Sequence, residues 1–143
     1  DDSTFDYIFS SEVLEHVFNI DEIISELNRV LKIDGKILIT LPFVWGEHEQ
    51  PYDFARYTSF GLKNILEKNG FEVIDHIKTT TFIETMTQSF TAYLYNSFVP
   101  KGFKTILTLT LIAPINFIGI LLGKVLPDDK TYYLNNIFVC KKK

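Results

Sequence analysis

The strongest constraint on the fold is an alternation of short apolar runs with helical patterns along the first 77 residues. Apolar runs at 5–10, 36–41 and 71–77 have the length and the flanking residues typical of strands. Between them, apolar residues recur at helical spacing over 20–31 and 58–68. A strand-helix-strand-helix-strand order predicts an α/β fold with a mostly parallel sheet.

The remainder of the chain adds a helical excursion and one more strand. Residues 80–126 are helical by pattern, and Tyr132–Cys140 is typical of a final strand, which can lie antiparallel to its neighbours. We therefore expect three segments: a core part over 1–79, an apolar helical insertion over 80–127, and the last core strand with a basic tail over 128–143.

Capping residues set the expected helix ends. Asn19, with Glu22 three residues later, is typical of an N-terminal capping box, and Thr58 can cap the second helix. We expect Gly35, after Asp34, to stop the first helix, and Gly70 to stop the second.

Composition excludes several classes of protein. With 46% hydrophobic and 22% charged residues over 143 positions, the chain is globular rather than disordered, and its length suits one domain. The single cysteine, Cys140, excludes an internal disulfide and a cysteine-based zinc site. Its apolar neighbours in a strand predict a buried structural thiol.

Charge is distributed unevenly along the chain. Residues 1–75 hold 15 acidic and 6 basic residues, whereas residues 76–143 hold 3 acidic and 8 basic ones. An acidic front half argues against nucleic acid as a partner, because neutralising phosphates requires a basic surface.

Residues with useful chemistry follow two of the expected strands. Ligands of open α/β sheets bind outside the carboxyl ends of the strands, so these groups should converge on one edge. A loop as long as 43–57 in a compact domain is usually functional. The residues after the first strand are Ser10, Ser11, Glu12, Glu15 and His16, and the loop carries Trp45, Glu47, His48, Glu49, Asp53, Arg56 and Tyr57.

Several segments, in this order and spacing, resemble the second half of a class I S-adenosylmethionine-dependent methyltransferase domain. They are Phe5-Asp-Tyr-Ile-Phe-Ser-Ser-Glu-Val-Leu-Glu-His-Val17, Leu27-Asn-Arg-Val-Leu-Lys-Ile-Asp-Gly35, Lys36-Ile-Leu-Ile-Thr-Leu-Pro42, Arg56-Tyr-Thr58 and Leu66-Glu-Lys-Asn-Gly-Phe71. The resemblance covers about residues 4–78, and the closing strand fits it. It implies a Rossmann-like fold and S-adenosyl-L-methionine as cofactor.

The resemblance also implies that the domain is truncated here. The family's glycine-rich cofactor loop and the acidic residue for the ribose hydroxyls have no counterpart in this chain, which contains no Gly-x-Gly. The chain begins at Asp1, and its only methionine is Met86. We therefore expect an N-terminally incomplete fragment with the family's fourth to seventh strands, an unpaired edge on its first strand, and no activity in isolation.

The resemblance assigns the candidate site residues. It implies that Ser10, Ser11 and Glu12 contact the methionine end of the cofactor. His16 and His48 are the candidate catalytic bases, since an imidazole titrates near neutral pH.

The rest of the loop offers groups for the methyl acceptor. Asp53, Arg56 and Tyr57 can bind a polar acceptor, with the alternative that Asp53 and Arg56 only pin the loop. Both alternatives stay open from the sequence.

Metal binding is not expected from the sequence. Glu12, Glu15 and His16, and the run 47–49, have suitable ligand chemistry, but their spacing matches no dedicated motif. Adjacent residues in a strand or loop also point apart.

The apolar excursion contains 19 residues without a charge, 105–123, between Lys104 and Lys124. As one helix it would span ~28 Å, about the thickness of a bilayer core. Pro114 at its centre predicts instead a pair of helices broken at the proline, forming a lid or a homodimer face. Peripheral membrane contact through 103–126 and a spanning helix remain alternatives.

We therefore expect methyl transfer to a small or lipid-linked acceptor, by a protein in the cytoplasm or peripheral at the membrane. The alternative is a non-catalytic, membrane-associated interaction module on a degenerate methyltransferase fold. A nicotinamide-dependent dehydrogenase is disfavoured, because the chain has no Tyr-x-x-x-Lys.

Overall fold

The computed structural model describes residues 1–98 and 101–143, and these form two compact units. Unit 1 consists of residues 1–79 and 134–143, and unit 2 of residues 80–133. The helical unit thus extends through residues 128–133, beyond the boundary expected from the sequence. Each unit is described by itself.

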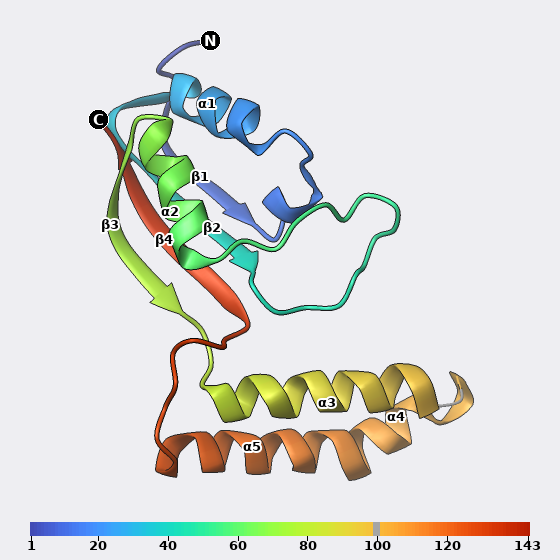
Figure 1. Ribbon diagram of the computed structural model, residues 1–143. Helices are drawn as coiled ribbons and strands as arrows, with labels where there is room; N and C mark the ends of the chain where they lie inside the picture. Colours follow the sequence, from blue (N-terminus) through green and yellow to red (C-terminus); the bar gives the residue numbers. More distant parts are fainter. Residues whose placement is uncertain (99–100) are drawn as a thin grey trace. The chain divides into compact units, whose positions relative to one another are not determined.

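Unit 1 is built on a four-stranded sheet with the strand order β1-β2-β4-β3 (Figure 1). The strands are β1 (Phe5–Ser11), β2 (Leu31–Pro42), β3 (Phe71–Lys78) and β4 (Asn135–Lys142). β1 pairs parallel with β2, and β4 lies antiparallel between β2 and β3. The α/β class and the antiparallel last strand are confirmed, although β4 begins at Asn135 rather than at Tyr132.

Helices α1 (Ile20–Val30) and α2 (Ser59–Lys68) cover one face of the sheet (Figure 1). Alternate residues of β2 point toward this face and are fully buried, because side chains on a strand alternate between its two sides. The core comprises Leu14, Ile20, Ile24, Leu31, Ile37, Ile39, Leu41, Leu62, Leu66, Phe71, Phe138 and Cys140. The predicted buried thiol of Cys140 is therefore confirmed.

The helix ends agree with the sequence only in part. Thr58 caps α2 as predicted, and its Oγ1 accepts a hydrogen bond from the Gly61 amide at 3.1 Å. Asn19 occupies the N-cap position of α1, but its side chain makes no capping bond. The prediction that Gly35 stops α1 is wrong: the helix ends at Val30, and Leu31 already belongs to β2. The buried side chain of Leu31 packs against Gly35, where a Cβ atom would come within 2.8 Å of it.

β1 forms one border of the sheet. Its outer edge has no strand partner among the described residues, as expected. Tyr7 and Phe9 are 76% and 70% exposed. This part of unit 1 therefore presents aromatic surface.

Unit 2 is a helical hairpin. α3 (Phe82–Phe98) packs along α5 (Ala113–Val125), and the two run in opposite directions (Figure 1). A short 3₁₀ turn (Lys101–Phe103), α4 (Lys104–Leu107) and a π-helical turn (Thr108–Ile112) lead into α5.

The prediction of two helices broken at Pro114 is wrong. Pro114 lies in the first turn of α5, inside a helix that continues from Lys104 to Val125. Proline is tolerated in a first turn, and the π-helical turn before it changes the hydrogen-bond pattern where the proline ring would clash. The chain therefore does not fold back at the proline.

Polar groups of the hairpin lie between its helices. Thr91 is buried and donates a hydrogen bond through Oγ1 to Asn116 Oδ1 at 3.0 Å. Gly119 is buried where the side chain of Thr87 meets α5. Many large apolar and aromatic side chains of the hairpin are exposed: Phe82, Met86, Phe90, Tyr93, Phe98, Phe103, Ile106, Leu109, Leu111, Phe117, Ile118, Ile120, Leu121, Leu122, Val125 and Leu126.

Candidate functional site

The site begins where β1 ends. Glu12 follows the strand with a φ of 52°, in the left-handed region, and turns the chain into a 3₁₀ turn over Leu14–His16. Leu14 is 1% exposed and anchors this turn in the core. The turn brings Glu15 and His16 to the carboxyl edge of the sheet.

The long loop after β2 folds back onto this turn. The amides of Phe54 and Ala55 donate to the Glu15 carbonyl at 2.9 and 3.3 Å. The ring nitrogen Nδ1 of His16 lies 2.6 Å from the Tyr52 carbonyl oxygen. Two segments remote in sequence therefore meet at one edge of the sheet.

An ion pair fixes the shape of the loop. Arg56 donates to both oxygens of Asp53, at 2.6 and 2.7 Å, and the His48 amide donates to Asp53 Oδ2 at 2.9 Å. The Asp53 side chain is 4% exposed. The hydrogen bonds from Arg56 hold the pKa of the Asp53 carboxyl well below its usual range. These contacts are those of the loop-pinning alternative.

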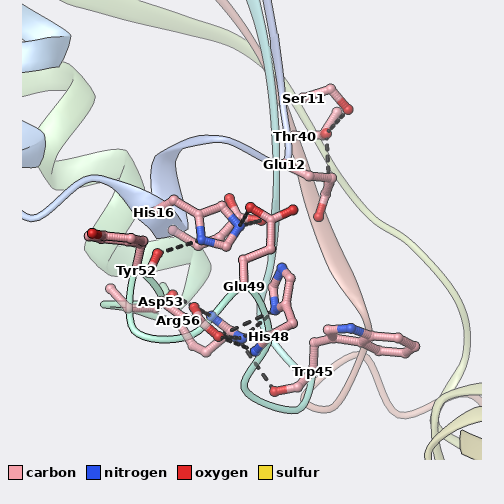
Figure 2. A network of polar contacts seen from close by, with 12 residues as sticks. Ser11, Glu12, His16, Thr40, Trp45, His48, Glu49, Tyr52, Asp53 and Arg56 are labelled. Atoms are coloured by element: carbon pink, nitrogen blue, oxygen red, sulfur yellow. Dashed lines mark hydrogen bonds and ion pairs between the residues drawn. The ribbon is translucent and has the colours of Figure 1, made fainter.

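The side chains of two histidines lie against each other at the carboxyl edge of the sheet (Figure 2). The rings of His16 and His48 meet edge to face with their centroids 4.7 Å apart. Nε2 of His16 lies 3.8 Å from Glu15 Oε1 and 3.9 Å from Glu49 Oε2. Nδ1 of His48 lies 3.2 Å from the Gly46 carbonyl oxygen and 3.3 Å from Asp53 Oδ2.

Glu15 is the most unusual residue of the site. Its side chain is fully buried, and neither carboxylate oxygen has a hydrogen-bond partner within 1–98 and 101–143. Burial raises the pKa of this carboxyl. The expectation that neighbours such as Glu15 and His16 point apart is wrong, because they lie in a 3₁₀ turn and not in an extended segment.

The predicted cofactor-binding residues form a second polar group at the same edge. Ser11 Oγ lies 2.8 Å from Thr40 Oγ1, and Thr40 Oγ1 donates to Glu12 Oε1 at 2.7 Å. Asn135 Nδ2 donates to the same Glu12 oxygen at 3.0 Å. Ser10 precedes them in β1 and is half-buried. The sequence alone did not single out Thr40 or Asn135, which join the group through sheet pairing.

Tyr57 ends the loop after β2, directly before Thr58, the N-cap residue of α2. Its ring packs against the core, its carbonyl accepts a hydrogen bond from Asn136 at 2.9 Å, and burial raises the pKa of its hydroxyl. Nearby, an open pocket of about 200 Å³ is lined by Trp45, Glu47, Asp53, Phe54, Ala55 and Arg56. This pocket suits a small polar group.

Comparison with known proteins finds methyltransferases both by sequence and by structure. Residues 1–39 match the family model described as a methyltransferase domain. Phosphoethanolamine N-methyltransferase 2 of Caenorhabditis elegans is 31% identical over 94 residues, which are 64% of this chain and 20% of the relative. The chain therefore spans about a fifth of the length of this curated relative.

Solved structures share the fold. Phosphoethanolamine N-methyltransferase 2 of Haemonchus contortus, in complex with phosphomonomethylethanolamine and S-adenosylhomocysteine, matches with a TM-score of 0.54 and 20% identity over 99% of this chain and 34% of that one. A sarcosine dimethylglycine methyltransferase structure from Galdieria sulphuraria matches with a TM-score of 0.58 and 16% identity over 100% of this chain and 55% of that one. At these identities the likeness concerns the fold.

The strand order places the antiparallel strand inside the sheet, and the polar residues gather at its carboxyl edge. This architecture is the Rossmann-like fold of class I S-adenosylmethionine-dependent methyltransferases, and the family-model match over residues 1–39 and the sequence relative support the same likeness.

Proposed function

We propose that the protein transfers a methyl group from S-adenosylmethionine to a small or lipid-linked acceptor at the carboxyl edge of unit 1. The observation that carries this proposal is the meeting of the turn after β1 with the loop after β2, which brings His16 and His48 into ring contact. Aligning an acceptor with a reactive methyl group is the main task of such a site.

The polar group at the end of β1 suits the methionine end of the cofactor. The exposed carboxylate of Glu12 can accept hydrogen bonds from an ammonium group, and the hydroxyls of Ser10 and Ser11 can pair with a carboxylate. Thr40 and Asn135 hold the Glu12 side chain in place. The cofactor would supply the electrophilic sulfonium methyl; these residues would orient it.

The histidine pair supports activation of the acceptor. His16 Nδ1 faces a carbonyl oxygen, so this nitrogen donates and the lone pair resides on Nε2. For His48, Nδ1 faces two oxygens but also Arg56 Nη2 at 3.3 Å, which can only donate, so either ring nitrogen of His48 can carry the proton. The lone pair on His16 Nε2 can therefore draw the proton of an acceptor away, and the Asp53–Arg56 pair keeps the loop in the position that this requires.

Methyl transfer can be tested in the full-length protein that carries this chain, with S-adenosylmethionine labelled in its methyl group and a panel of small and lipid-extracted acceptors. Replacing His16 by Asn should lower turnover by about 100-fold or more, the usual range for losing acid-base assistance. The matched control is His76→Asn, because His76 is half-buried, stacks on Phe138 and lies outside the site. Equal turnover in H16N and the parent protein would contradict the role of His16.

We further propose that unit 2 contacts a membrane, which would make the protein cytoplasmic and peripheral at the bilayer. One helix, Lys104–Val125, is long and apolar enough to cross a membrane, with a mean hydropathy of 2.2 and 6% of that window buried. Its outer surface carries apolar side chains, and basic residues such as Lys104 and Lys124 flank it. Flotation with anionic lipid vesicles tests this contact; a protein that stays entirely out of the floated fraction would favour a lid or a dimer face.

A further inference from the structure

We propose that Glu15, His16 and His48 bind a divalent transition-metal ion. One ligand atom from each of the three residues lies within 4.8 Å of the others. This inference rests on the proposed methyl transfer and deepens it: an ion held by Glu15 and the two imidazoles activates the acceptor, in place of direct proton removal by a histidine Nε2.

The buried carboxylate is the strongest argument. Glu15 is completely inaccessible, and no described residue gives either of its oxygens a hydrogen bond. Burying a carboxylate without a partner is costly, so such groups are normally paired or bound to a metal. Glu15 Oε1 lies 3.8 Å from His16 Nε2, and one ligand atom of Glu15 lies within 4.8 Å of those of both histidines.

The surroundings of both imidazoles are those of metal ligands. A ligating histidine usually donates its other ring N–H to a carbonyl or a carboxylate, which fixes the tautomer and the ring orientation. His16 Nδ1 meets the Tyr52 carbonyl oxygen at 2.6 Å, which leaves its Nε2 available to an ion. His48 Nδ1 meets the Gly46 carbonyl oxygen at 3.2 Å and Arg56 Nη2 at 3.3 Å; when it donates to Gly46, its Nε2 is available as well.

The three ligand atoms would have to close around an ion. Bonds from zinc to nitrogen and oxygen are roughly 2.0–2.2 Å, so two ligand atoms of a tetrahedral ion lie about 3.4 Å apart. The present atoms lie within 4.8 Å of one another, and side-chain rotation would bring them closer. Glu49 Oε2 lies 3.9 Å from His16 Nε2 and is an exposed fourth ligand, which can yield to an acceptor.

The donor set favours Zn²⁺ or Mn²⁺ over Mg²⁺, since two imidazoles accompany the carboxylates. The ion would bind an acceptor oxygen and lower the pKa of its hydroxyl. The hydroxyl proton would then leave to water, the oxygen would form its bond to the methyl carbon, and the carbon–sulfur bond would break to leave S-adenosylhomocysteine.

Calorimetric titration of the 143-residue chain with ZnCl₂ or MnCl₂ tests the site directly. We expect one ion per chain, and binding about 100-fold weaker in Glu15→Gln, which keeps the shape of the side chain but removes its charge. Glu22→Gln, an exposed acid on α1, and His76→Asn are the matched controls and should bind as the parent chain does. Circular dichroism checks the fold of each variant.

Glu15→Gln should fold, because it removes an unpartnered buried charge. If it does not, His48→Asn tests the same site from the loop, where the side chain is 32% exposed. Absence of stoichiometric binding by the parent chain, or equal affinities in the parent chain and either site variant, would overturn the proposal. So would binding of an amine acceptor to Glu15 in a chain that takes up no metal.

Activity separates this inference from the proposed function. Methyl transfer that continues unchanged in EDTA would refute the metal site and leave the proposed methyl transfer intact. One bound ion in a protein that methylates no acceptor would refute the proposed function and leave the metal site intact. Loss of transfer in EDTA, restored by Zn²⁺ or Mn²⁺, supports both.

Discussion

The two units of this chain distribute polar and apolar groups in opposite ways. In unit 1, α1 and α2 bury apolar residues such as Ile24 and Leu62 against the sheet. In unit 2, Thr91 and Asn116 bond to each other between the helices, whereas Phe117 and Ile118 are 61% and 55% exposed.

We attribute this difference to the different surroundings that we propose for the two units. Apolar burial drives folding in water, as in unit 1. Helices that associate in lipid instead rely on small residues and interhelical hydrogen bonds, which is the arrangement around Gly119 and Thr91. The proposed membrane contact of unit 2 follows from this contrast, and each prediction below bears on it.

The largest effect is expected in the core of unit 1. Ile39→Ala should lower its free energy of unfolding by about 3 to 4 kcal/mol, because Ile39 is fully buried and the substitution leaves a cavity. Leu121→Ala, on the outer surface of unit 2, should cost less than about 0.5 kcal/mol. Urea titration in mild detergent, followed by Trp45 fluorescence for unit 1 and circular dichroism for unit 2, compares them. Equal losses in the free energy of unfolding for the two variants would contradict the proposed difference between unit 1 and unit 2.

A charge on the outer surface of unit 2 should weaken vesicle binding. Ile118→Lys places an ammonium group among apolar side chains, and we expect partition into anionic vesicles to fall by about tenfold or more. Thr105→Lys, next to Lys104 at the helix end, is the control and should retain binding. Unchanged partition of I118K would mean that this surface does not enter lipid.

The hydrogen bond inside the hairpin should contribute less. Thr91→Val removes the donor to Asn116 Oδ1 and should lower the stability of unit 2 by about 1 kcal/mol. Thr110→Val is matched to it, because Thr110 is exposed and bonds to the Ile106 carbonyl of its own helix. Thermal unfolding by circular dichroism should separate the two variants, and identical midpoints would show that the interhelical bond contributes nothing.

The smallest effect near neutral pH concerns Cys140. Burial raises the pKa of its thiol from the usual 9.0 to about 12, so the native thiol stays protonated where the unfolded one ionises. Stability should be unaffected below pH 9 and should fall as pH rises from there toward 12. At pH 8, Ellman's reagent should modify the chain only after unfolding, and rapid reaction of the folded chain would contradict the burial of Cys140.

The fold of unit 1 follows closely from its sequence because the apolar periodicity of each element matches its place in the sheet. Asp34-Gly35 led to the wrong end for the first helix. Leu31 packs in the core as the first residue of β2, so the helix ends before it and the residues after it belong to the strand. Pro114 led to the wrong prediction of a helix break. A π-helical turn precedes it, and the helix continues through it. Tertiary packing overrides local signals in both cases.

The sequence predicted which edge of the sheet carries the candidate site, but not how the side chains are arranged there. Ligands of open α/β sheets bind outside the carboxyl ends of the strands, and this predicted His16 and His48 at the carboxyl edge of the sheet. The sequence could not reveal that the Glu15 carbonyl receives the loop after β2, or that the Glu15 side chain is buried without a partner. Such burial depends on residues about 40 positions away.

The contrast between the units is tested most directly by placing a fluorescent label on each. Because the native thiol of Cys140 is buried, Ile118→Cys and Glu22→Cys can each be labelled singly with an environment-sensitive dye. On addition of vesicles, the emission of the dye at residue 118 should shift to shorter wavelength and be quenched by spin-labelled lipid, while the dye at residue 22 should stay unchanged. A dye at residue 118 that remains in water, at vesicle concentrations that bind the protein, would contradict the proposed lipid contact of unit 2.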